Sequence, residues 1–114
     1  MDLQSIIDHL ELRLLTEPKD FTQIVPGSGY ASDLLSCVMA GAKKDGIWIT
    51  LQSHDNIVAV AALLELAAVI ITEDAQPESS TVARAVAKNI TLLSTPLSTF
   101  EIVGKLWEMG LRSE

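Results

Sequence analysis

The stretch "GIWITLQSHDNIVAVAALLELAAVIIT", residues 46–72, decides how this chain folds. From Ile57 to Thr72 it carries one formal charge, Glu65, and it could be either a membrane segment or a buried part of a globular domain. A membrane-spanning helix needs about 20 consecutive apolar residues. The run is shorter than that and Glu65 interrupts it, so its length favours the globular interpretation.

The apolar run divides into a helical part and an extended part. Residues 56–65 are rich in Ala and Leu and follow polar residues suited to capping, which predicts a helix. Residues 67–71 end in β-branched side chains just before the polar "TED", which is typical of a buried strand. Residues 47–51 resemble a strand in the same way. We therefore predict a strand, a helix and a second strand across this stretch.

The same alternation continues on both sides of the stretch. Towards the C-terminus we predict a helix at 78–88, a strand at 91–93 and a helix at 98–109. In the last helix, Phe100, Val103, Leu106 and Trp107 are predicted to share one face. Towards the N-terminus we predict a helix at 3–10, strands at 12–16 and 21–25, a Gly-rich turn at 26–30 and a helix at 31–42.

Strands that alternate with helices are typical of a parallel sheet with crossover connections. We therefore predict one α/β domain over residues 1–114, with three layers and a mainly parallel sheet flanked by helices. The 48% hydrophobic content of the 114 residues is sufficient for a core of this kind.

Charge and composition exclude several classes of partner. The net charge is −7 and only Lys43-Lys44 are adjacent cations, whereas binding to nucleic acid needs clustered Lys and Arg. We expect no nucleic-acid and no membrane partner. The first residues include an acid and no basic segment, so we predict no signal peptide and a cytoplasmic location.

The chain offers little for metal binding or covalent catalysis. Its single cysteine, Cys37, cannot form an intramolecular disulfide and lies among apolar residues, so we expect it to be buried. No His or Cys spacing typical of a metal site occurs, and we expect no metal and no cofactor. His54 and Asp55 are adjacent and so do not form a dyad by spacing. We predict no catalytic residues and no enzyme activity.

Two segments, "YASDLL" at 30–35 and "LSTPLSTFE" at 93–101, carry the most specific resemblance to a known family. Across residues 3–110 the chain resembles the DRTGG domain. The resemblance implies a fold similar to the N-terminal domain of HPr kinase/phosphorylase. It also implies an accessory or regulatory module, because such domains occur beside CBS domains in some inorganic pyrophosphatases and within some phosphotransacetylases.

Two loops depart from the family pattern. Where the family name implies Thr-Gly-Gly, this chain has Thr72-Glu73-Asp74. Where a Gly-Asp-Arg-like loop is expected, it has residues 53–56, Ser-His-Asp-Asn. Glycines that let the backbone approach a phosphate are thus replaced by acids at the first loop, which weakens the case for anion binding there.

Polar residues follow each predicted strand, and in an open parallel sheet ligands lie outside the carboxyl ends of the strands. These residues could form a small pocket with donors at helix starts, or they could simply cap helices and fill turns. Tyr30 could lie at the rim of the pocket or be a core or interface aromatic. The candidate ligand-binding residues are Tyr30, Ser53, His54, Asn56, Thr72, Ser94, Thr95 and Thr99.

These observations support two functional hypotheses. The first is a non-catalytic regulatory or assembly domain that forms a homodimer through the Ala-rich or the Trp107-bearing helical surface, with a further protein partner as an option. The alternative is a module that binds a nucleotide or another phosphorylated metabolite at the carboxyl ends of the central strands.

Overall fold

The computed structural model describes all residues, 1–114, and contains one five-stranded sheet. Neighbouring strands are parallel except at one edge, where β1 is antiparallel to β5. The predicted α/β fold with a mainly parallel sheet is therefore confirmed. In spatial order the strands are β1 (Arg13–Leu14), β5 (Leu92–Ser94), β4 (Ala68–Ile71), β3 (Ile47–Thr50) and β2 (Gly29–Ala31).

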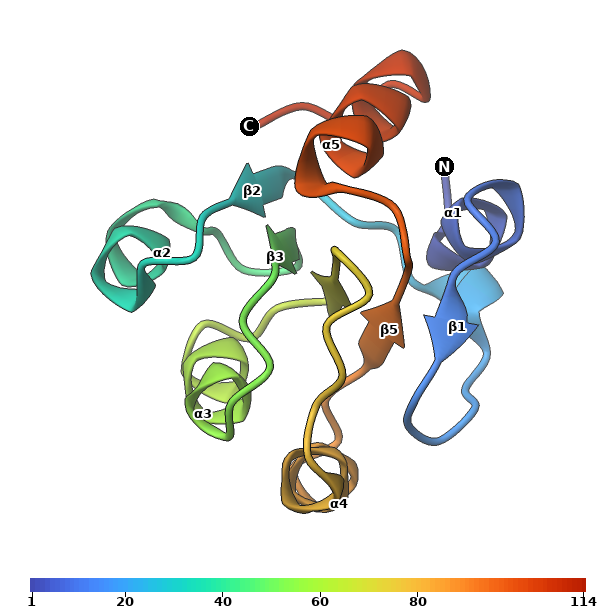
Figure 1. Cartoon of the computed structure of the whole chain (residues 1–114). Helices are drawn as coiled ribbons and strands as arrows, with labels where there is room; N and C mark the ends of the chain where they lie inside the picture. Colours follow the sequence, from blue (N-terminus) through green and yellow to red (C-terminus); the bar gives the residue numbers. More distant parts are fainter.

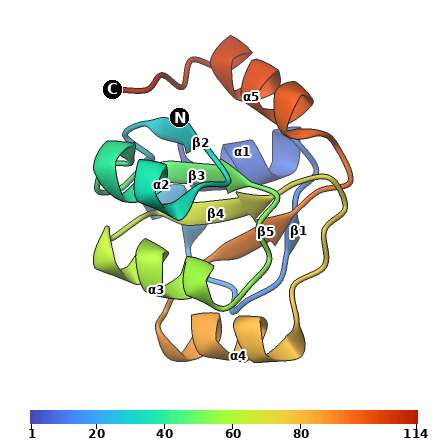
Figure 2. The same cartoon turned by 60° about the vertical axis from the view of Figure 1, so that its left-hand side comes forward.

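Helices cover both faces of the sheet, which gives three layers (Figures 1 and 2). One face packs against α1 (Leu3–His9) and α5 (Thr99–Glu108). The other face packs against α2 (Leu35–Gly41), α3 (Asn56–Leu63) and α4 (Ser79–Ala87). The predicted helices at 56–65, 78–88 and 98–109 thus occur within two residues of their expected bounds.

Alternation along the central strands supplies a core to each face. Ile47 and Ile49 of β3 belong to the core beneath α1 and α5, whereas Trp48 between them belongs to the core beneath α2, α3 and α4. All four residues of β3 and all four of β4 are buried. Burial on both faces is why the sequence of these strands is almost continuously apolar.

The isolated charge in the apolar run lies at the turn between α3 and β4. Glu65 has a left-handed backbone, φ 55°, and its carbonyl accepts the Asp45 N–H at 3.0 Å. Its exposed carboxylate lies 3.1 Å from the Lys44 ammonium. The run is therefore a helix followed by a strand, as predicted. None of the helices is both long and apolar enough to span a bilayer.

The predicted strand at 21–25 and the turn at 26–30 are wrong. Phe21–Gln23 forms a 3-10 helix, which starts where the Asp20 carboxylate accepts the Thr22 N–H. The strand is instead β2, which pairs with β3 at the sheet edge. At Gly29, the first residue of β2, an added Cβ would lie 2.9 Å from the Leu111 side chain, which would have to move.

The helix predicted at 31–42 is shorter than expected. The Asp33 carboxylate accepts the Thr50 hydroxyl and the Leu51 N–H, both at 2.8 Å, and so joins this segment to the end of β3. The α2 helix begins only after these contacts, at Leu35. Cys37 is exposed, which contradicts the prediction, because the side of α2 that meets the core presents Val38 instead.

The α5 helix also differs from the prediction, because it is apolar on two sides. Ile102 and Leu106 are buried against the sheet. The other three residues expected on one face with Leu106 point towards solvent: Phe100 is 89% exposed, Val103 37% and Trp107 56%.

Candidate functional site

The carboxyl ends of β3 and β4 are tied together by Thr72. Its N–H donates to the Thr50 carbonyl at 2.9 Å. Its hydroxyl lies 2.6 Å from the Thr99 hydroxyl, at the start of α5. Thr72 is fully buried, so its polar atoms need partners inside the protein, and these contacts provide them.

The start of α5, which would present N–H groups to a ligand if the carboxyl edge were a binding site, already has two of these groups bonded within the protein. The Glu73 carboxylate accepts the Thr99 N–H at 2.8 Å, and the Ser98 hydroxyl accepts the Glu101 N–H at 3.2 Å. The backbone of Glu73 (φ 61°) and Asp74 (φ 57°) is left-handed, a conformation that glycine adopts most easily. An internal carboxylate thus lies where the helix dipole would favour a negative group.

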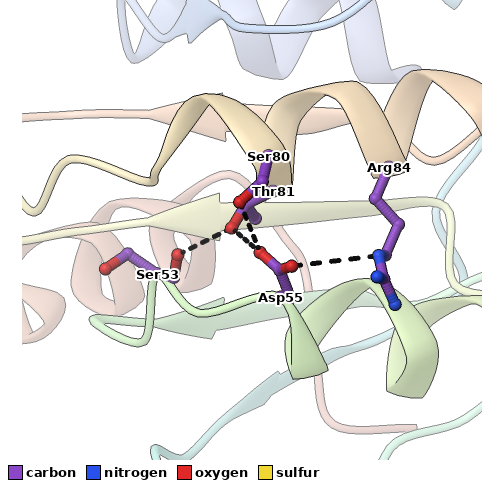
Figure 3. Close-up of polar contacts among 5 residues, drawn as sticks. All are labelled: Ser53, Asp55, Ser80, Thr81 and Arg84. Atoms are coloured by element: carbon purple, nitrogen blue, oxygen red, sulfur yellow. Dashed lines mark hydrogen bonds and ion pairs between the residues drawn. The ribbon is translucent and has the colours of Figure 1, made fainter.

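A second polar cluster joins the loop before α3 to α4 (Figure 3). The Thr81 hydroxyl donates to the Asp55 carboxylate at 2.5 Å, and the Ser80 hydroxyl donates to the same oxygen at 3.2 Å. The Arg84 guanidinium lies 3.9 Å from the other carboxylate oxygen. The Thr81 hydroxyl, followed by the Ser80 hydroxyl and the positive charge of Arg84, holds the pKa of Asp55 below its usual range. This cluster joins the start of α3 to α4, and its polar atoms already have partners within the protein.

The structure brings only some of the candidate ligand-binding residues together. Thr72 and Thr99 are hydrogen-bonded, and Thr95 is close to them, because its carbonyl accepts the Asp74 N–H. The carbonyl of Ser53 accepts a bond from Thr81, and His54 and Asn56 are exposed.

Two other candidates lie apart from this group. Ser94 is buried in β5 and pairs with Arg13 of β1. The ring of Tyr30 packs against α2, where it leaves no room for a Cβ at Gly41. Tyr30 is thus partly buried against the α2 side of the core, as one of its two interpretations held.

A pocket that the sequence did not reveal lies between β2 and α5. Its volume is about 130 Å³, and seven of its ten lining residues are hydrophobic. The sequence did not indicate this pocket because the residues of β2 were predicted to belong to a turn and to the start of a helix. The lining residues are Gly29, Tyr30, Ala31, Ile49, Val103, Leu106, Trp107, Leu111, Arg112 and Ser113.

Arg112 fixes one wall of this pocket. Its guanidinium lies 3.9 Å from the centre of the Trp107 ring and donates to the Trp107 and Leu111 carbonyls at 2.8 and 3.0 Å. Its own carbonyl accepts the Gly29 N–H at 2.8 Å, so the C-terminal segment is attached to the edge strand. The pocket therefore has a mostly apolar lining with one charged side chain, that of Arg112.

The side chains that could hold a metal do not converge anywhere in the structure: no group of three or more His, Cys, Asp or Glu residues is found. The candidate sites are thus the polar carboxyl edge of the sheet and the apolar pocket beside α5.

Comparisons with known proteins identify the family. Residues 5–109 match the DRTGG domain. The regulatory region of Clostridium perfringens pyrophosphatase, whose CBS and DRTGG domains were crystallised with the activator diadenosine tetraphosphate, has a similar fold, with a TM-score of 0.72 and 21% identity. The match covers 90% of this chain and 44% of that one, so this chain spans less than half of that region. Comparison with curated protein sequences found no match. This chain belongs to the DRTGG domain family.

Proposed function

We propose that this chain is a non-catalytic regulatory or assembly domain, that it forms a homodimer, and that it acts through protein contacts in the cytoplasm. Its family membership supports a regulatory role, because the DRTGG domain of that pyrophosphatase belongs to a regulatory region. We do not attribute the activity of that pyrophosphatase to this chain, because this chain spans only part of the matched region.

One observation carries the proposal: the polar groups at the carboxyl edge bond to one another, whereas the apolar groups beside α5 are exposed. Thr72 and Glu73 both form hydrogen bonds with Thr99. Phe100 and Trp107 have most of their surface in solvent. Exposed aromatic side chains that adjoin an apolar pocket are typical of protein interaction surfaces.

A second candidate function is binding of a nucleotide or another phosphorylated metabolite at the carboxyl edge. It is supported by the similarity to a region crystallised with diadenosine tetraphosphate. The Glu73 carboxylate opposes it, because it occupies the N–H group of Thr99 and would repel a phosphate. Its site would be formed by Ser53, Asn56, Thr72, Thr95 and Thr99.

Two measurements separate the candidates. Light scattering across a hundredfold dilution should give twice the chain mass of 12.3 kDa at high concentration without any ligand. A thermal-shift screen with adenine nucleotides, diadenosine tetraphosphate and acetyl phosphate should leave the melting temperature unchanged. A ligand at 100 times its Kd would stabilise the fold by about 2.7 kcal/mol. A monomeric mass throughout, with a saturable shift that Thr95→Ala abolishes, would reverse our choice.

A further inference from the structure

The outer side of α5 carries three exposed apolar residues, Phe100, Val103 and Trp107, which we call the α5 stripe. Their spacing of three and four residues places them on one side of the helix. They lie on a different side of the helix from the buried Ile102 and Leu106, and no other helix or strand covers this side of α5 (Figure 2). Phe100 is the most exposed large hydrophobic residue in the chain, at 89%. Apart from Arg112, whose guanidinium lies over the Trp107 ring, the stripe is therefore an apolar surface open to solvent.

Gly104 lies in the middle of this exposed side. A methyl group added to Gly104 would meet no atom within 4 Å, so nothing within the monomer requires a glycine there. Glycine inside a helix is destabilising relative to alanine. A common reason to keep one is the close approach of another backbone. Within this structure no backbone approaches Gly104, which points to one from outside the chain.

The pocket beside the stripe has the size of one aromatic ring. Its volume is about 130 Å³. An engineered protein cavity that binds benzene measures about 150 Å³, whereas sites for small-molecule ligands usually measure about 300–1,000 Å³. The pocket fits a single aromatic side chain better than it fits a nucleotide. Val103 and Trp107 belong both to its lining and to the α5 stripe.

We propose that the partner on the α5 stripe is a second copy of this chain. This inference rests on the homodimer proposed above and specifies its interface. The two α5 helices pack antiparallel across a two-fold axis near Val103 and Gly104. Residues 100 and 107 lie at equal distances from this point. Each Phe100 ring therefore lies over Trp107 and Val103 of the other copy, at the mouth of the pocket.

The symmetry of the stripe is what selects a second copy over an unrelated protein. A two-fold interface must be self-complementary: the contact of residue i with residue j is repeated as that of j with i. An aromatic ring at one end of the stripe and a ring-sized pocket at the other meet this requirement. Gly104 on the axis lets the helices approach closely.

The exposed aromatic surface supplies more than half of the area that a dimer needs. Buried aromatic residues each cover about 150–250 Å², so the exposed parts of Phe100 and Trp107 in both copies amount to roughly 600 Å². Specific interfaces bury about 1,000 Å² or more in total. Val103, Gly104 and the rim of the pocket supply additional contact area.

Sedimentation velocity of three variants tests the proposal. Phe100→Lys and Gly104→Leu should each raise the dimer dissociation constant at least about thirtyfold, because each removes or blocks a central contact twice per dimer. Both positions are open in the monomer, so both variants should stay folded, and Gly104→Leu should be somewhat more stable because glycine is unfavourable inside a helix. The control is Leu63→Lys, which changes another largely exposed apolar residue, 66% exposed on α3, and should leave the dissociation constant unchanged.

Disulfide trapping tests the geometry independently. In a Cys37→Ser background, Gly104→Cys should form an intermolecular disulfide within minutes of adding copper phenanthroline, because two Cα atoms within about 7 Å can be bridged. Leu63→Cys in the same background should not. A dimer that is unaffected by Phe100→Lys and Gly104→Leu, or that is trapped equally at residue 63, would overturn this interface but leave the proposed homodimer. A chain that is monomeric throughout would overturn both.

Discussion

The carboxyl edge of the sheet and the outer side of α5 differ in whether their side chains have partners within the protein. At the carboxyl edge, Thr72, Glu73 and Thr99 bond to one another and leave little for a ligand. On α5, Phe100 and Trp107 have no partner for most of their surface. The residue types of the first region allowed either ligand binding or helix capping. The comparison teaches that polar residues already bonded within the protein act as helix caps, whereas groups without a partner can form a binding site. Only the structure shows which groups have partners.

The largest effect is expected from breaking the Thr72–Thr99 contact. Thr72→Val should lower the free energy of unfolding by about 1–2 kcal/mol, or roughly 5–10 °C in Tm, because the partly buried Thr99 hydroxyl loses its partner. Thr72→Val/Thr99→Val should cost less than the sum of the single variants by about 0.5–1 kcal/mol, since neither hydroxyl is then left unpaired. Thermal unfolding of all four proteins measures this coupling. If the two single losses of stability add up to that of the double variant, the two hydroxyls do not stabilise each other.

A smaller effect separates the two roles of Glu73. Glu73→Ala should destabilise the fold by about 1 kcal/mol, because it removes the carboxylate from the start of α5 but keeps the left-handed backbone. Glu73→Gly loses the same contact, but it also relieves the strain of φ 61°, so its stability should be close to that of the wild type. Urea unfolding of the pair is the measurement. Equal losses in both variants would mean that no strain is stored at this loop.

The cluster at Asp55 predicts a pH dependence. Its pKa is lowered in the folded state, chiefly by the Thr81 hydroxyl. The resulting stabilisation is present above the unfolded pKa, about 3.9, and is lost as the pH falls through the folded pKa. The wild type should therefore exceed Asp55→Asn in stability at pH 7, and the difference should shrink towards pH 3. Asp2, whose pKa is also lowered, cancels in this comparison. A difference that grows on acidification would contradict the assignment.

The smallest effect concerns salt and the α5 interface. Glu101 and Glu108 lie on the same flank of the α5 stripe, and a two-fold axis places each flank beside its own copy. Raising NaCl from about 0.05 M to about 0.5 M screens this repulsion and should tighten the dimer by a few fold. Sedimentation at the two salt concentrations measures it. Weaker association at high salt would indicate an interface held by opposite charges.

Much of the fold could be predicted because its central strands are buried on both faces. The apolar runs at 47–51 and 67–71 have no other place in a globular domain of this size. In contrast, β2 has three residues, two of them Gly and Ala, and no apolar pattern distinguishes it from a turn. The segment at 21–25 is apolar enough for a strand, but the Asp20 cap starts a 3-10 helix.

The candidate sites were harder to predict for a different reason. Ser, Thr, Asp and Asn are the residues that cap helices and also those that bind ligands, so composition alone could not decide between the two roles. On α5 the difficulty is one of orientation. Because the helix is apolar on two sides, its sequence did not indicate that Ile102 and Leu106 face the core while Phe100 and Trp107 face solvent.

Acrylamide quenching of tryptophan fluorescence tests most directly whether this domain works through the α5 surface. Trp48 is fully buried and Trp107 is 56% exposed, so accessible emission comes from Trp107. We predict that quenching is weak at high protein concentration, rises as the dimer dissociates on dilution, and does not respond to adenine nucleotides. Strong quenching that is independent of protein concentration, or that changes only when a nucleotide is added, would contradict the account.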